Sequence, residues 1–399
     1  MRTIRPDDLT HAATPLLQTP FHARTAALNR LHRWGPWAGH RAALCFGDAD
    51  MEYTAIRNGA TIYDLCPMLK YAIRGPDAAD YLNRLTIRNA AKLPVGGVQY
   101  TAWCDDAGKL LDDGTLFRHA ADHYRICCQE RHLNWLLDSA EGFDVTVVEV
   151  TETIAALSLQ GPCSAEVLKA AGFDVASLKP FRMTDYPFGN GRLTISRTGF
   201  TGDLGYELWL DPTEALPLWD HLFSAGAPWN LRPIGSDALN LARIEAGFIV
   251  TNMDFIAADQ ALREDRPRSP LEMGLAWMID WDRGHFTGRR ALQAEQARGS
   301  DWALVALEVG GNISAEGSLL YHNRKTEAGF ITAAAWSPSV KKSIALAQVP
   351  ARHRSGDNLW VEIYALRELQ YVKLMLPVTV VERPFFNPPR KRATPPGRF

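Results

Sequence analysis

Apolar and polar positions follow two different periods along the first three quarters of the chain. Helical spacing is found at 52–58 and again after Asp77, where Ala79, Tyr81, Leu82 and Leu85 share one face. Strand-like runs lie between such segments, among them LKYAIRG and TETIAALSLQGP, each ending at a glycine turn signal. Strands mixed with helices predict an α+β arrangement of layers.

Further along, SAEVLKAAG and SDALNLARIEAG predict helices that begin at serine caps, the second at Ser236. The run QYTAWCDDAGKLLDDGTLFRHA predicts two strands joined by a turn at 105–108. After about residue 293 the pattern changes to short β-rich segments separated by Gly, Asn, Asp and Pro. We therefore expect two interleaved α+β lobes over 1–293, a small β-barrel or sandwich over 294–386, and an extended tail over 387–399.

Composition narrows the class of protein. The chain has 399 residues, 46% hydrophobic and 22% charged, which excludes a small disulfide scaffold and a disordered chain. The formal charge of −2 offers no basic field for nucleic acid. No apolar run approaches the roughly 20 residues of a membrane span. The N-terminus carries charges where a secretory signal would be apolar, and six scattered cysteines lack CxxC spacing, so we expect a cytoplasmic protein with reduced thiols.

Familiar catalytic motifs are missing from the sequence. There is no P-loop, HExxH, GxSxG or glycine-rich dinucleotide turn. His119 and His123 are the one close histidine pair, and surface imidazoles are the favoured interpretation over a zinc site. We therefore expect no metal.

Two motifs carry candidate chemistry. In GKLLDDG, the adjacent Asp112 and Asp113 lie on a strand, so their side chains should face opposite ways and only one should do chemistry. In SRTGFTGDLGYE, three glycines allow close approach of a flat ligand, and Glu207 could accept paired hydrogen bonds from a pterin or purine edge. Taken alone, the first motif also fits a capped surface turn and the second a plain hairpin.

The chain resembles the glycine cleavage T-protein family of folate-dependent aminomethyltransferases and demethylases over nearly its whole length. The resemblance lies in seven ordered stretches: EYTAIRNGATIYDLCPMLKYAIRGPDA, YTAWCDDAGKLLDDG, LSLQGPCSAEVL, SRTGFTGDLGYEL, RIEAG, the block from SPLEMGL to FTGRRAL, and SPSVKKSIALAQVP. It implies a three-lobed ring with a central cavity for tetrahydrofolate and a C-terminal β-barrel as the third lobe.

The resemblance also implies roles for individual residues. Asp113 would face the folate nitrogens at the reacting centre, and Glu207 would hold the pterin edge. The remaining positions that match cofactor-binding sites in relatives are Tyr100, Met68, Gln160 and either Phe385 or Phe386.

Departures from the family pattern indicate a branch. A folate-binding arginine of the T-protein is replaced by Leu239, whereas Arg243 of the RIEAG motif is retained. Lys109 replaces a glycine before the carboxylates, and 64–68 reads DLCPM. The stretch 197–203 has no cysteine, unlike the iron-sulfur maintenance branch. These differences favour a stand-alone demethylase that forms 5-methyltetrahydrofolate; the alternatives are an aminomethyltransferase that makes 5,10-methylenetetrahydrofolate and a non-catalytic folate-binding protein.

The methyl donor is left open between sulfonium, aryl ether and methylamine. Trp103 could line its pocket, although a buried strand tryptophan more often belongs to a core. Arg118 and Arg125 could bind a substrate carboxylate, or could equally form surface ion pairs. The expected partner is a small-molecule methyl donor, with a homodimer as an option and no nucleic acid or membrane.

Overall fold

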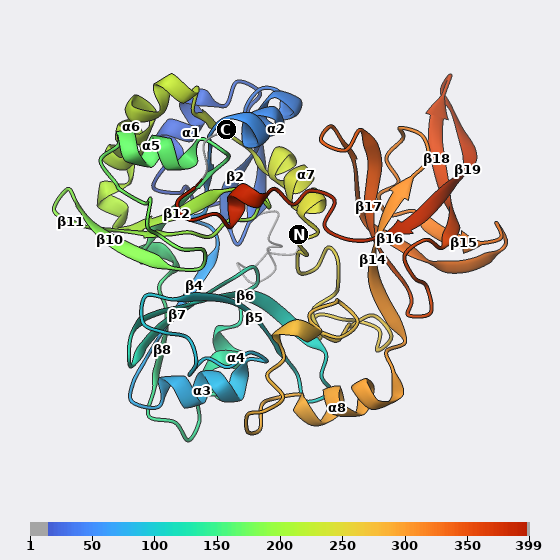
Figure 1. Cartoon of the computed structure of the whole chain (residues 1–399), viewed down its shortest axis with the longest axis horizontal. Helices are drawn as coiled ribbons and strands as arrows, with labels where there is room; N and C mark the ends of the chain where they lie inside the picture. The colour runs from blue at the N-terminus through green and yellow to red at the C-terminus, as the bar shows by residue number, and fades with distance from the viewer. Residues whose placement is uncertain (1–14, 397–399) are drawn as a thin grey trace, which may run out of the picture.

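The computed structural model describes residues 15–396, apart from the side chain of Arg367. Two α/β units and a β-barrel surround a common centre, and the C-terminal segment crosses from the barrel back to the first unit (Figure 1). The two mixed units and the barrel, which is the third lobe, confirm the predicted α+β class. Residues 1–14, which include most of the stretch considered for a secretory signal, and residues 397–399 of the tail lie outside the described residues.

The first unit is a six-stranded sheet in the order β10-β11-β12-β9-β3-β13. Its strands are β3 (Thr61–Asp64), β9 (Ala155–Gln160), β10 (Met183–Phe188), β11 (Gly191–Ser196), β12 (Gly205–Leu210) and β13 (Arg232–Pro233). Helices α5 (Ser164–Ala170) and α6 (Ala215–Gly226) pack on one face. Because side chains alternate along a strand, Tyr206 and Leu208 enter this core, whereas Glu207 and Trp209 face the other way.

The second unit is a five-stranded antiparallel sheet in the order β5-β6-β7-β4-β8. Its strands are β4 (Leu69–Arg74), β5 (Val98–Cys104), β6 (Leu110–Ala120), β7 (His123–Cys128) and β8 (Thr146–Glu149). Helices α3 (Ala78–Leu85) and α4 (Leu133–Asp138) cover the outer face. On the inner face, Val98, Phe117 and Cys127 pack with Trp209, so the inner faces of the two sheets meet at the centre.

Helices α2 (Ala49–Asn58) and α7 (Ser236–Ala246) pack together near the centre. Helix α7 also contacts β2 (His40–Cys45), which forms a hairpin with β1 (Arg33–Trp37); helix α1 (His22–Leu28) precedes this hairpin in the chain. Helix α2 begins three residues before the predicted start, because the Asp48 carboxylate accepts hydrogen bonds from two backbone N–H groups of its first turn. The predicted serine caps are wrong: Ser164 and Ser236 are the first helical residues, after Cys163 and Gly235.

A closed barrel in the order β14-β17-β16-β15-β18-β19 forms the third lobe. Its strands are β14 (Trp302–Val309), β15 (Leu319–His322), β16 (Thr326–Ser337), β17 (Lys342–Pro350), β18 (Asn358–Arg367) and β19 (Gln370–Val381). The predicted boundary at residue 293 falls inside α8 (Arg289–Arg298), ahead of the first barrel strand. Short 3-10 turns include η6 (Ala276–Met278), beside the centre, and η7 (Pro389–Lys391), in the tail.

Within residues 15–396, no helix is long and apolar enough to cross a bilayer.

Candidate functional site

The two adjacent carboxylates of β6 have different surroundings. Asp112 is fully buried; it accepts hydrogen bonds from the backbone N–H of Glu130 (2.9 Å) and the Thr251 hydroxyl (2.5 Å), and lies 3.2 Å from a ring nitrogen of His132. Asp113 is half-buried and accepts a hydrogen bond from the Tyr100 hydroxyl at 2.7 Å. Asp112 therefore has a structural role, and Asp113 is the carboxylate left for chemistry.

The Asp113 carboxyl holds its proton more tightly than an ordinary aspartate. Burial raises its pKa to about 7, and the neighbouring charge of Asp112 adds to the rise. Hydrogen bonds from Tyr100 and Thr251 oppose it. Burial, followed by the Asp113 charge, raises the pKa of Tyr100 well above its usual value, so this phenol stays a hydrogen-bond donor. A carboxyl with such a pKa can exchange a proton near neutral pH.

Glu207 forms a second carboxylate centre on the inner face of β12. The Thr198 hydroxyl donates a hydrogen bond to Glu207 at 2.5 Å, and burial raises the pKa of Glu207 to about 7. The Thr198 hydrogen bond and the positive charge of Arg125 both oppose this rise. With a pKa of about 7, Glu207 can lose its proton near neutral pH and then accept hydrogen bonds from donor groups of a ligand.

Arg125 lies close to Glu207, on the inner face of β7. Its guanidinium stands 4.4 Å from the ring centre of Phe117 and 4.2 Å from that of Trp209, and burial lowers its pKa. Nε and Nη2 have no hydrogen-bond partner among the described residues. Because leaving such donors unsatisfied is costly, this arginine fits a ligand that brings an acceptor to the centre.

Gln160 does not line the centre, which corrects the expectation drawn from relatives. It is 0% exposed, and its amide donates to the carbonyls of Thr198 and Tyr206 and accepts from the Thr201 hydroxyl. A Cβ at Gly205 would lie 2.0 Å from its amide oxygen. Gln160 therefore supports the glycine loop from beneath, and the glycine is needed for that close approach.

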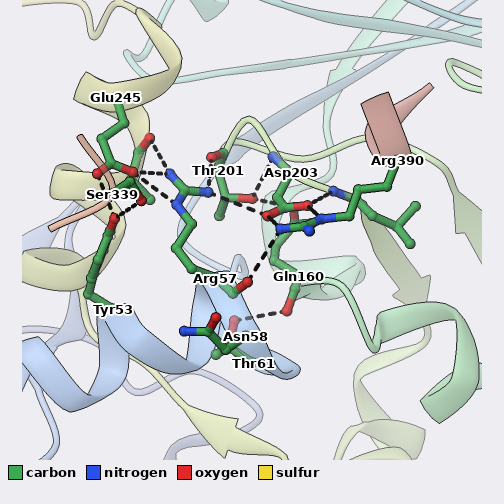
Figure 2. Close-up of polar contacts among 12 residues, drawn as sticks. Tyr53, Arg57, Asn58, Thr61, Gln160, Thr201, Asp203, Glu245, Ser339 and Arg390 are labelled. Carbon is green, nitrogen blue, oxygen red and sulfur yellow. Dashed lines mark hydrogen bonds and ion pairs between the residues drawn. The ribbon is translucent and has the colours of Figure 1, made fainter. Parts of the chain in front are cut away.

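A network of charged side chains joins the glycine loop to α2, α7 and the tail (Figure 2). Arg57 donates to Glu245 at 2.9 and 2.6 Å and to the carbonyl of Thr201 at 2.8 Å. Arg390 donates twice to Asp203, at 2.6 and 2.7 Å. Since each guanidinium meets a carboxylate, the network is neutral and fixes the loop that leads to Glu207.

The tail phenylalanines occupy different environments. The Phe386 ring covers the Arg57 guanidinium at 4.1 Å, and its backbone N–H donates to the carbonyl of Glu245. Phe385 packs against the apolar cluster that includes Tyr100. Of the two, Phe385 therefore shares an apolar cluster with Tyr100, whereas Phe386 belongs to the charged network. Met68 is half-buried in the cluster of Phe117 and Trp209, at the meeting of the two sheets.

Two predicted substrate contacts lie on the wrong face of their sheet. Trp103 is 0% exposed in the core under α3 and packs edge-on against His132, because it alternates with Tyr100 along β5. Arg118 covers the Tyr124 ring and donates to backbone carbonyls such as that of Leu93 at 2.7 Å. The alternation of strand side chains turns both away from the centre, so these two predictions are wrong.

Sequence reasoning missed Thr251 and His132. Thr251 follows α7 and reaches the carboxylate pair across more than 130 residues, and His132 arrives from the start of α4. No local motif marks either residue. His119 and His123 stand with ring centres 5.0 Å apart, and within residues 15–396 no group of three or more His, Cys, Asp or Glu side chains is arranged to hold a metal.

Comparison with known proteins agrees with this geometry. Residues 23–283 match the GCVT N-terminal domain, and residues 303–387 match the glycine cleavage T-protein C-terminal barrel domain. The chain therefore belongs to the glycine cleavage T-protein family. Members of this family are tetrahydrofolate-dependent one-carbon transferases, and this chain is such an enzyme.

Particular relatives carry two kinds of name. An aminomethyltransferase of Geobacillus thermodenitrificans is 30% identical over 94% of this chain and 98% of its own length. A trimethylamine-oxide aldolase of Ruegeria pomeroyi is 32% identical over 94% of this chain, which spans about half of that protein (48%). The aminomethyltransferase T of Bartonella henselae has the same fold, with a TM-score of 0.81 at 23% identity over 94% of this chain and 99% of that one.

The residues at the centre fit tetrahydrofolate. A pterin edge offers an N–H and an amino group as donors and a carbonyl as acceptor, which matches the Glu207 carboxylate and the unsatisfied nitrogens of Arg125. The buried rings of Phe117 and Trp209 hold the Arg125 guanidinium in place beside Glu207.

Proposed function

We propose that the chain transfers a methyl group from a small O-, S- or N-methyl donor to N5 of tetrahydrofolate, giving 5-methyltetrahydrofolate. The observation that carries this proposal is the half-buried Asp113 carboxyl, with its pKa near 7 and its hydrogen bond from Tyr100. In the transfer, the bond between carbon and the donor heteroatom breaks with its electron pair on the heteroatom, and the new bond forms to N5. Asp113 would stabilise the positive charge that builds on N5 and accept its proton.

Leu239 supports methyl transfer over aminomethyl transfer. The folate-binding arginine expected here in a T-protein is absent, and Leu239 lies on α7 within the same cluster as Trp209 and Phe117. Arg125 places a guanidinium against these two rings from the other sheet. We infer that Arg125 takes over contact with the pterin carbonyl, which leaves the donor side of the centre different from that of an aminomethyltransferase.

The name of one relative also favours a methylated donor. The trimethylamine-oxide aldolase matches almost the whole of this chain, and its name specifies a methylated nitrogen compound. Several similar relatives are named aminomethyltransferases, so aminomethyl transfer is the second candidate function.

One experiment separates the two candidates. The purified protein is incubated without oxygen with tetrahydrofolate and, in turn, dimethylsulfoniopropionate, vanillate, syringate, glycine betaine, dimethylglycine and trimethylamine oxide. Folate products are followed by mass spectrometry. We expect 5-methyltetrahydrofolate from at least one donor, and about a 100- to 10,000-fold lower rate in Asp113→Asn. Formation of 5,10-methylenetetrahydrofolate alone would instead identify an aminomethyltransferase.

A further inference from the structure

Tyr100 connects the reacting carboxylate to a second group of side chains. Its hydroxyl donates to Asp113, and its backbone carbonyl accepts a hydrogen bond from Arg88 at 3.0 Å. The Trp277 ring, on η6, lies 6.4 Å from the Tyr100 ring and 5.5 Å from the Arg88 guanidinium. Trp277 is 65% exposed, which is unusual for so large an apolar side chain. This group therefore lies next to Asp113 and is open to solvent on one side.

Arg383 joins the group from the C-terminal segment. Burial lowers its pKa, and the guanidinium is close enough to Tyr100 to oppose part of the rise in the pKa of that phenol. Its Nη2 donates to the carbonyl of Met273 at 2.8 Å, in the apolar cluster against which Tyr100 also packs. Arg88 and Arg383 thus place two guanidinium groups around one tyrosine.

Both arginines keep most of their donor capacity. Each guanidinium carries five N–H groups, and each makes one hydrogen bond among the described residues, to a backbone carbonyl. Neither has a carboxylate within 4.0 Å in residues 15–396. Arg57 and Arg243, which are buried elsewhere, each meet a carboxylate. Two half-buried guanidinium groups with free donors, beside a reacting centre, match an anion supplied by a substrate.

We propose that Arg88 and Arg383 bind the carboxylate of the methyl donor, so that the donor is a small carboxylic acid with its methyl group on sulfur, nitrogen or oxygen. This inference rests on the proposed methyl transfer. The charges are complementary: the methylated end faces the Asp113 carboxylate, the acid end faces the guanidinium groups, and Trp277 covers the apolar part between them. A donor without an acid group, such as trimethylamine oxide, would lack this contact.

The test is binding of matched ligands, measured by calorimetry on the full chain without folate. Each carboxylate is paired with a relative that lacks the carboxylate: dimethylsulfoniopropionate with its methyl ester, glycine betaine with choline, and vanillate with guaiacol. The variants are Arg383→Gln, Arg383→Lys and Arg88→Gln. Arg24→Gln, at an exposed ion pair with Asp220, is the control. We expect at least a tenfold weaker binding of one carboxylate in the glutamine variants, no change for its relative without the carboxylate, and partial recovery in Arg383→Lys.

Folate is the other source of a carboxylate, through its glutamate. Binding of tetrahydrofolate is therefore compared with that of tetrahydropteroate, which lacks the glutamate. If Arg383→Gln weakens tetrahydrofolate alone, the arginines bind folate and the donor assignment is overturned. Equal binding of donors with and without the carboxylate, or no binding of any carboxylate, also overturns it. Arginine-dependent donor binding without 5-methyltetrahydrofolate would refute the proposed methyl transfer and leave the carboxylate site standing.

Discussion

Removing the Tyr100 hydroxyl should move the pH dependence of the reaction. In Tyr100→Phe, Asp113 loses the hydrogen bond of 2.7 Å that favours its charged form. A hydrogen bond to a charged group contributes about 1.5–3 kcal/mol, and one pH unit corresponds to about 1.4 kcal/mol, so the loss equals about one to two pH units. The pKa of Asp113 should rise, because its charged form loses the stabilising hydrogen bond.

The proposed methyl transfer uses the Asp113 carboxylate, so the wild-type rate should rise with pH through about 7, the pKa of this group. In Tyr100→Phe the rise should lie at about pH 8 to 9, with roughly a tenfold lower rate at pH 7 and recovery at pH 9. The assay is the initial rate of 5-methyltetrahydrofolate formation from a productive donor, between pH 5.5 and 9.5, at saturating substrates.

A matched control is Tyr364→Phe, which removes the hydroxyl of an exposed barrel tyrosine and should leave the profile unchanged. An unchanged or downward-shifted rise in Tyr100→Phe would refute the reasoning. A loss of rate that is equal at every pH would show that Tyr100 acts by positioning the substrates and not through the pKa of Asp113.

Three further predictions concern the glycine loop. Burial raises the pKa of Glu207 to about 7, so the folded state retains a proton that the unfolded chain releases near pH 4.5. The melting temperature should therefore fall as pH rises from about 4.5 to 7, and this fall should be smaller in Glu207→Gln. Gly205→Ala should destabilise the fold, since its Cβ would lie 2.0 Å from the Gln160 amide, and adding Gln160→Ala should restore part of the melting temperature; no restoration would contradict this contact. Arg390→Ala should weaken tetrahydrofolate binding several-fold by freeing Asp203, whereas unchanged affinity in fluorescence titration would show that the tail does not position the loop.

The hairpin around the carboxylate pair was predictable because its contacts are local. Its turn residues and alternating pattern defined β5 and β6, and cross-strand register then brought Tyr100 near Asp113, 13 positions away in sequence. The barrel was predictable for a similar reason, since its six strands are separated by clear turn signals.

Helix starts were predicted less well. Asp48 caps α2 through its carboxylate, and the sequence prediction began that helix three residues too late. At α5 and α7, serine occupies the first helical position with no side-chain cap. A serine that precedes a helical pattern fits either position, so propensity alone does not separate the cap from the first turn.

The sequence by itself determined the class of fold and the family, because these rest on local periodicity and ordered motifs, and its motifs singled out Asp113 and Glu207 as candidate site carboxylates. The tertiary structure decided how each side chain is used. The side chains of Trp103 and Arg118 lie on the outer face of their sheet, and Gln160 lies under the glycine loop. Thr251 reaches Asp113 from a distant segment of the chain. Burial and nearby charges set the pKa of a carboxyl group such as Asp113, and the neighbours of an arginine decide whether its guanidinium meets a carboxylate. These surroundings form only when distant parts of the chain pack together.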